Sequence, residues 1–156
     1  MALNETDMKV LKAIYQKTLE KDSDIIPAKD LGINEIDLTD SLEMLSKYNY
    51  IDLSLSTIGS NTIRITPKGF YKYTTQFDKA KHALFELVAD QIINKKEYNS
   101  NVITKSLNIS ALITHLILHY FSDIGELIIT EFMDGRIEIN HVGVELKRKY
   151  QKRNGA

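Results

Sequence analysis

The sequence predicts an α+β fold that is mostly helical and consists of two similar units, each with three helices and a β-hairpin. Apolar residues recur at helical spacing over most of the chain. The period changes from helical to two at "YIDLSL" and again at "TIRIT" (62–66), which indicates strands. The segment "IRITPKGFYKY" (63–73) also returns in similar form as "IEINHVGVELKRKY" (137–150). Together these observations predict a duplicated unit.

The chain aligns with itself when it is shifted by 76 residues, and by 74 residues beyond the hairpin turn. The paired core positions are Leu31 with Leu107, Ile33 with Ile109, Leu42 with Leu118, Leu45 with Phe121, Ile51 with Leu127, Leu53 with Ile129, Ile63 with Ile137, and Ile65 with Ile139. The second hairpin is therefore two residues shorter, and "MDGR" predicts a tight Asp-Gly turn. Self-similarity of this kind predicts repeated units. We expect one domain at 1–76 and a second at 77–156.

The first helix is expected over residues 4–22, with an apolar face at helical spacing. Asn4 or Thr6 can cap it, because a short polar side chain accepts hydrogen bonds from the free N–H groups of the first turn. A short second helix is expected to begin at Pro27, where a missing N–H costs nothing, and to end at Gly32.

Asn34 is expected to cap a third helix, "EIDLTDSLEMLSKYN". Its predicted buried line is Leu38, Leu42, Leu45 and Tyr48. Turn residues Gly59, Ser60 and Asn61 separate the two strands that follow, and Pro67 ends their pairing because it has no N–H to donate. A long helical segment follows, interrupted near residues 74–78.

The stretch "LGINEIDLTDSLEMLSKYNYIDL…IRITPKGF" resembles the winged-helix regulators of the MarR, ArsR and PadR kind. It shares their helix-turn-helix, leucine pair, tight turn into a strand, and closing I-x-x-T-x-x-G pattern. The resemblance covers residues 5–75, and it departs at Asn49, where these proteins usually have glycine. Asparagine tolerates the left-handed backbone better than most residues. The resemblance implies a winged helix-turn-helix domain and a DNA-binding transcription regulator. With the repeat, it predicts two such domains in tandem, and we expect the regulator to act as a dimer.

The composition predicts a soluble, cytoplasmic protein without membrane contact. Apolar residues make up 43% and charged residues 26% of 156, and the net charge is −1. The absence of cysteine excludes disulfides and thiolate metal sites. No apolar run approaches the length of a membrane span. No phosphate-binding glycine loop or nucleophile motif is present, so we expect no enzyme and no cofactor.

Winged helices present their third helix to the major groove and their hairpin to the DNA backbone. The candidate DNA contacts are Asn34, Thr39, Lys47, Asn61, Arg64, Lys68, Lys149 and Arg153. Residues 34–48, however, carry a net charge of −3, which opposes phosphate contact. A second interpretation therefore stays open: a protein-interaction adaptor made of two winged helices that does not bind DNA.

The basic run "KRKYQKR" (147–153) is expected to continue the final helix. Lys149, Lys152 and Arg153 would then share one helical face. Such a face either contacts phosphate or is simply solvated near the negative end of the helix dipole.

The predicted third helix of the second unit, "SALITHLILHYFS" (110–122), is apolar almost all round. Ile113 and Leu116 stand where the first unit has acidic residues, and Tyr120 extends the apolar patch. We interpret these three residues as an interface. It either packs within the chain or joins a homodimer or another protein, and the sequence favours neither.

His115, His119 and Asp123 are spaced four residues apart on this helix, so they could present three metal ligands from one face. The HExxH motif is absent because residue 116 is leucine, and no cysteine completes a site. The sequence therefore predicts no metal. The histidines could instead titrate at an interface, because imidazole changes charge near neutral pH.

Overall fold

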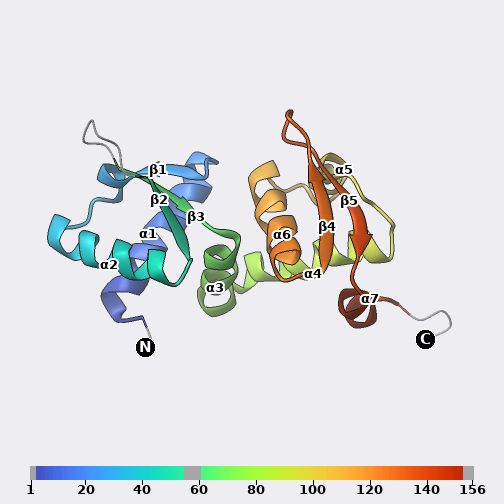
Figure 1. Ribbon diagram of the computed structural model, residues 1–156, viewed down its shortest axis with the longest axis horizontal. Coiled ribbons are helices and arrows are strands. Elements are labelled where there is room, and N and C mark those ends of the chain that lie inside the picture. The colour runs from blue at the N-terminus through green and yellow to red at the C-terminus, as the bar shows by residue number, and fades with distance from the viewer. Residues whose placement is uncertain (1–2, 55–60, 153–156) are drawn as a thin grey trace. The chain divides into compact units, whose positions relative to one another are not determined.

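The computed structural model describes residues 3–54 and 61–152, without the side chain of Glu35. These residues form an α+β structure that is mostly helical, with two small antiparallel sheets (Figure 1). The helices are α1 (Glu5–Lys21), η1 (Ala28–Leu31, a 3-10 helix), α2 (Glu35–Lys47), α3 (Pro67–Phe77), α4 (Lys79–Ile93), α5 (Ser100–Leu107), α6 (Ala111–Asp123) and α7 (Val144–Tyr150). The strands are β1 (Ile25–Pro27), β2 (Ile51–Ser54), β3 (Thr62–Ile65), β4 (Leu127–Glu131) and β5 (Ile137–Val142).

The chain divides into two compact units, Met1–Phe77 and Asp78–Ala156. The interruption expected near residues 74–78 is confirmed, since α3 ends at Phe77 and Asp78 caps α4 with its side chain. Among the described residues, no helix combines the length and apolar character that crossing a bilayer requires. The expected turn residues Gly59 and Ser60 lie outside the described residues.

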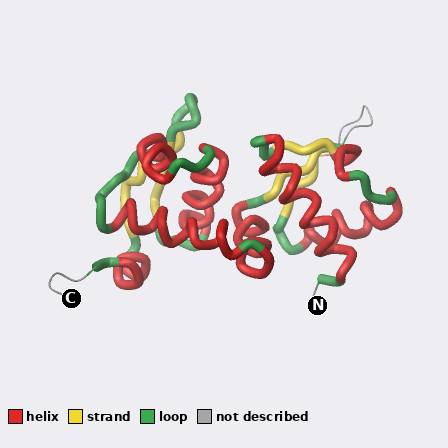
Figure 2. The backbone as a smooth tube through the Cα atoms, turned by 180° about the vertical axis from the view of Figure 1, so that it is seen from behind, coloured by secondary structure: helices red, strands yellow, loops and turns green. Residues whose placement is uncertain are grey.

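The first unit contains a three-stranded sheet in the order β1-β3-β2 (Figure 2). Helices α1, α2 and α3 complete its core. Asn4 caps α1 by accepting a hydrogen bond from the backbone N–H of Asp7, whose carboxylate accepts in return from the N–H of Asn4. The predicted cap is therefore confirmed at Asn4. Along α1, Val10, Leu11 and Ile14 are fully buried, as the helical spacing predicts.

The short helix expected to begin at Pro27 begins later, because Ile25–Pro27 pairs with β3 as an edge strand. An edge strand tolerates proline since the missing N–H need not face a partner. The N–H of Ala28 extends the contact by donating to the carbonyl of Asn61 at 2.9 Å. The 3-10 turn then ends at Gly32, as expected.

Helix α2 is capped as predicted, since the side chain of Asn34 accepts from the N–H of Ile36. The expected inner line is also confirmed: Leu38, Leu42 and Leu45 are buried, and Tyr48 is half-buried.

Both units turn from helix to strand with the same backbone pattern. Asn49 has φ 62° and Gly125 has φ 81°, so asparagine supplies in the first unit the left-handed residue that glycine supplies in the second. The residue after each of these donates its N–H back to the helix. In the first unit the N–H of Tyr50 donates to the carbonyl of Leu45 at 2.9 Å, and in the second unit the N–H of Glu126 donates to the carbonyl of Phe121 at 2.8 Å. These bonds satisfy carbonyls that the helix end would otherwise leave free.

The second unit contains helices α4, α5 and α6, the β4–β5 hairpin and α7. The ring of Phe85 on α4 meets Phe121 on α6 edge-on at 5.9 Å, and Ile117 and Leu118 are fully buried. A single bridge between Asn99 and Glu138 takes the place that β1 occupies in the first unit.

The hairpin turn differs from the expected tight Asp-Gly turn. Phe132 N–H donates to the carbonyl of Arg136 at 2.8 Å, and Gly135 N–H donates to the carbonyl of Phe132 at 2.9 Å. Of the three residues between them, only Gly135 has a positive φ. The loop therefore has three residues, and its left-handed glycine closes the hairpin.

Helix α7 ends at Tyr150, so the basic run does not continue as a helix over its whole length. Gln151 is extended, and Lys152 is held by Asn94, which accepts from its N–H at 3.0 Å. Lys149 and Lys152 therefore do not share a helical face. Arg153 lies outside the described residues.

Candidate functional site

The outer face of α2 in the first unit is open. Ile36 is 76% exposed, and Asp37 and Asp40 are exposed beside it. In the second unit the equivalent helix differs, because Ile113 and Leu116 keep only 7% and 6% of their surface exposed. Only the first unit leaves this face of its helix accessible in the described part of the chain.

The structure places the candidate DNA-contact residues of the first unit at the surface. Those exposed are Asn34, Thr39, Lys47, Asn61, Arg64 and Lys68. They come from α2 and its N-cap, from β3 and the residue before it, and from α3, and α2 packs against β2 of the same sheet. Lys149, exposed on α7, belongs to the second unit.

Arg64 lies on the central strand β3 and is surrounded by acidic groups. Its Nε is 3.2 Å from Oδ2 of Asp24, and Asp52 is its cross-strand neighbour on β2. Arg64 and Asp52 line a hollow on the sheet, together with Ile25 and Leu53. The positive charge of Arg64 is thus largely balanced within its own unit.

Lys68 lies at the start of α3 with its Nζ 5.4 Å from the centre of the Tyr50 ring. Burial raises the pKa of the Tyr50 hydroxyl above its ordinary value of 10.0, and Tyr48 adds to this effect. The ring therefore stays neutral and offers its face to the ammonium group.

The three interface candidates differ in their exposure. Ile113 and Leu116 are buried in the single chain, whereas Tyr120 is half-buried. The ring of Tyr120 meets Phe85 edge-on at 5.4 Å. Aromatic pairs favour this geometry, so Tyr120 contributes to the packing between α4 and α6.

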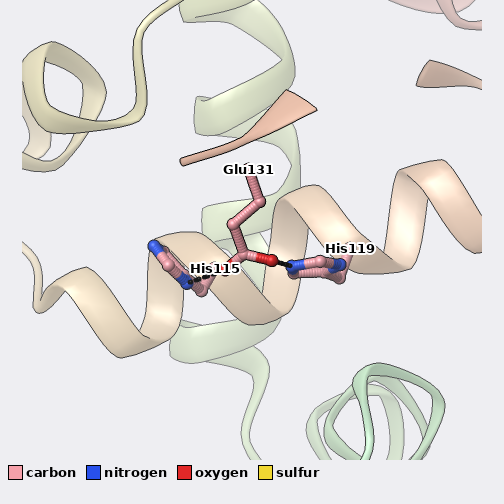
Figure 3. A group of neighbouring side chains, drawn as sticks. All are labelled: His115, His119 and Glu131. Carbon is pink, nitrogen blue, oxygen red and sulfur yellow. Dashed lines mark ion pairs between the residues drawn. The ribbon is translucent and has the colours of Figure 1, made fainter. Parts of the chain in front are cut away.

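His115 and His119 form a cluster with Glu131, which the sequence did not single out (Figure 3). Nδ1 of His115 is 3.5 Å from Oε1 of Glu131, and Nε2 of His119 is 3.2 Å from Oε2. Asp123, the carboxylate that the spacing suggested, is exposed and is not part of this cluster. The sequence did contain one signal for this cluster. Glu131 is the last residue of β4, and β4 packs on α6, the helix that carries both histidines.

No protein-family model matches the chain, and a search of curated proteins finds no match to it.

Proposed function

We propose that the chain is a tandem winged-helix protein that acts as a dimeric, DNA-binding transcription regulator through its first unit. The proposal is supported by the element order that both units share, three helices followed by a hairpin and a helix, with one strand pairing beside the hairpin. The left-handed residues Asn49 and Gly125 at equivalent turns add to this support.

The open face of α2 is the observation that carries the proposal. A groove-reading helix must be free of covering side chains over one face, and α2 meets this condition at Ile36, Asp37 and Asp40. Carboxylates on this face can accept hydrogen bonds from cytosine amino groups. Lys47 and Lys68 would contact phosphates, which supply most of the affinity for DNA.

A dimer would present two first units to two half-sites of an operator. Binding as a dimer predicts that the operator is a palindrome. Sedimentation velocity of the free chain and of its DNA complex tests this part of the proposal. Two copies per duplex are expected, and one copy per duplex would refute it.

The second candidate is a protein-interaction adaptor that does not bind DNA. The ion pair between Arg64 and Asp24 and the acidic exposed residues of α2 favour this alternative. A basic protein surface would complement the same open face without phosphate repulsion.

The affinity for duplex DNA, measured over a salt series, separates the two candidates. A regulator should bind more weakly as salt rises, with a steep negative slope. Lys47→Gln should weaken binding and reduce the slope by about one, because it removes one of the two proposed phosphate contacts. Lys12→Gln removes the same charge from an exposed position on α1 and serves as the control. The absence of binding at low salt would favour the adaptor.

A further inference from the structure

We propose that His115, His119 and Glu131 form a binding site for a divalent first-row transition ion of the zinc type. The site would join helix α6 to the last residue of strand β4. The inference does not depend on DNA binding, since all three residues belong to the second unit.

The three side chains offer one ligand atom each within 4.8 Å of one another. His115 and His119 project from successive turns of α6, where residues four apart are neighbours on one face. Glu131 reaches toward both imidazoles from β4, so a single carboxylate lies between the two rings (Figure 3).

The spacing suits a tetrahedral ion. Zinc–nitrogen and zinc–oxygen bonds of about 2.0–2.1 Å place neighbouring ligand atoms about 3.4 Å apart. The observed distances lie close to that value, at 3.5 Å from His115 to Oε1 of Glu131 and 3.2 Å from His119 to its other oxygen, Oε2. The ligand atoms of the two histidines also lie within 4.8 Å of each other.

The type of donor defines the class of ion. Two imidazoles and one carboxylate suit zinc and its borderline neighbours, whereas magnesium and calcium prefer oxygen ligands throughout. Three protein ligands leave a fourth position for water or an external group. The side chains of His115, His119 and Glu131 are 27%, 34% and 45% exposed, so an ion can reach them from solvent.

The packing of α6 on β4 and the turn of the β4–β5 hairpin hold the three side chains of the cluster near one another. Helix α6 packs on β4, which fixes the distance between the histidines and the glutamate. The turn of the hairpin approaches His115, since a Cβ added at Gly135 would lie 4.0 Å from Cε1 of that ring. Arg136 in the same hairpin pairs with Glu138 at 3.4 Å, which leaves Glu131 to the histidines.

The experiment is a titration of the untagged, chelator-treated full chain with zinc alone, followed by calorimetry and by the absorption of a cobalt substitute. One ion per chain is expected, with a tetrahedral cobalt spectrum and a higher melting temperature in zinc, because an ion that binds only the folded state stabilises it. A chelator should reverse both changes. No saturable binding would overturn the proposal.

The variants test which carboxylate is the ligand. Glu131→Gln and His119→Asn should each weaken zinc binding by at least roughly 100-fold, because each removes a ligand. Asp123→Asn removes a carboxylate four residues from His119, and His141→Asn removes an exposed histidine of the same unit. Both controls should bind like the unchanged chain. The assignment of Glu131 as the ligand would be refuted if Glu131→Gln bound zinc as tightly as the unchanged chain. It would also be refuted if only Asp123→Asn lost zinc binding.

Discussion

Gly69 lies so close to Tyr50 that a Cβ added to the glycine would come 2.0 Å from the carbonyl oxygen of the tyrosine. The second unit repeats this contact between Gly143 and Glu126, where the corresponding backbone distance is 3.1 Å. In both units the last helix thus begins directly against the residue that precedes the first hairpin strand. A side chain at either glycine would separate the two segments.

Gly69→Ala is expected to destabilise the first unit by about 3 kcal/mol, because the neighbouring backbone must move. Gly143→Ala is expected to cost about 1–2 kcal/mol, since its nearest neighbour at 2.8 Å is the end of a flexible glutamate side chain. Chemical denaturation gives the free energies, and amide hydrogen exchange resolved by NMR assigns the loss to one unit. Equal effects of both substitutions would contradict the expectation.

Substitutions at Asn49 test how much stability depends on a residue that accepts the left-handed backbone after α2. Asn49→Ala should lower the free energy of unfolding by about 1 kcal/mol, because alanine is strained at φ 62°. Asn49→Gly should change it by less than about 0.5 kcal/mol, since glycine removes the strain but adds unfolded-state entropy. Gly125→Ala is the matched change in the second unit. Thermal unfolding followed by circular dichroism measures all three.

The buried hydroxyl of Ser41 donates to Oδ1 of Asp7 at 2.8 Å and joins α2 to the first turn of α1. Ser41→Ala should cost about 1–2 kcal/mol, because the buried carboxylate loses a donor. The double variant with Asp7→Ala should show a coupling of about 1 kcal/mol in a double-mutant cycle. Ser46→Ala on the same helix is the control, and strict additivity would disprove the coupling.

Lys21 lowers the pKa of the Asp30 carboxyl below its ordinary value of 3.8, chiefly through a hydrogen bond between their side chains. The pKa of Asp30 is lower in the folded state than in the unfolded state, so its interaction with Lys21 stabilises the folded state above pH 3.8. This stabilisation is lost as the pH falls through the folded pKa. Lys21→Gln should raise the pKa of Asp30 toward 3.8. An NMR titration of the carboxyl carbon measures this shift, and Lys12→Gln should leave the pKa unchanged.

Local features of the sequence predicted much of the secondary structure. Asn4, Asn34 and Asp78 cap helices because their short side chains reach N–H groups two or three residues away. The strand at Ile25–Pro27 was not predicted. Three residues are too few to show the alternation of apolar and polar side chains that indicates a strand, and Pro27 is a residue type common at helix starts. Its pairing with β3 depends on contacts nearly 40 residues away.

The sequence by itself determined the helical periods, the caps and the left-handed turn residues, since these depend on neighbours within a few positions. The tertiary structure alone decided that α2 keeps an open face, that Asp24 balances Arg64, and that Glu131 rather than Asp123 meets the histidines. Helix and strand packing sets these relationships, and the spacing of residues along the chain does not encode the distance between side chains on different elements.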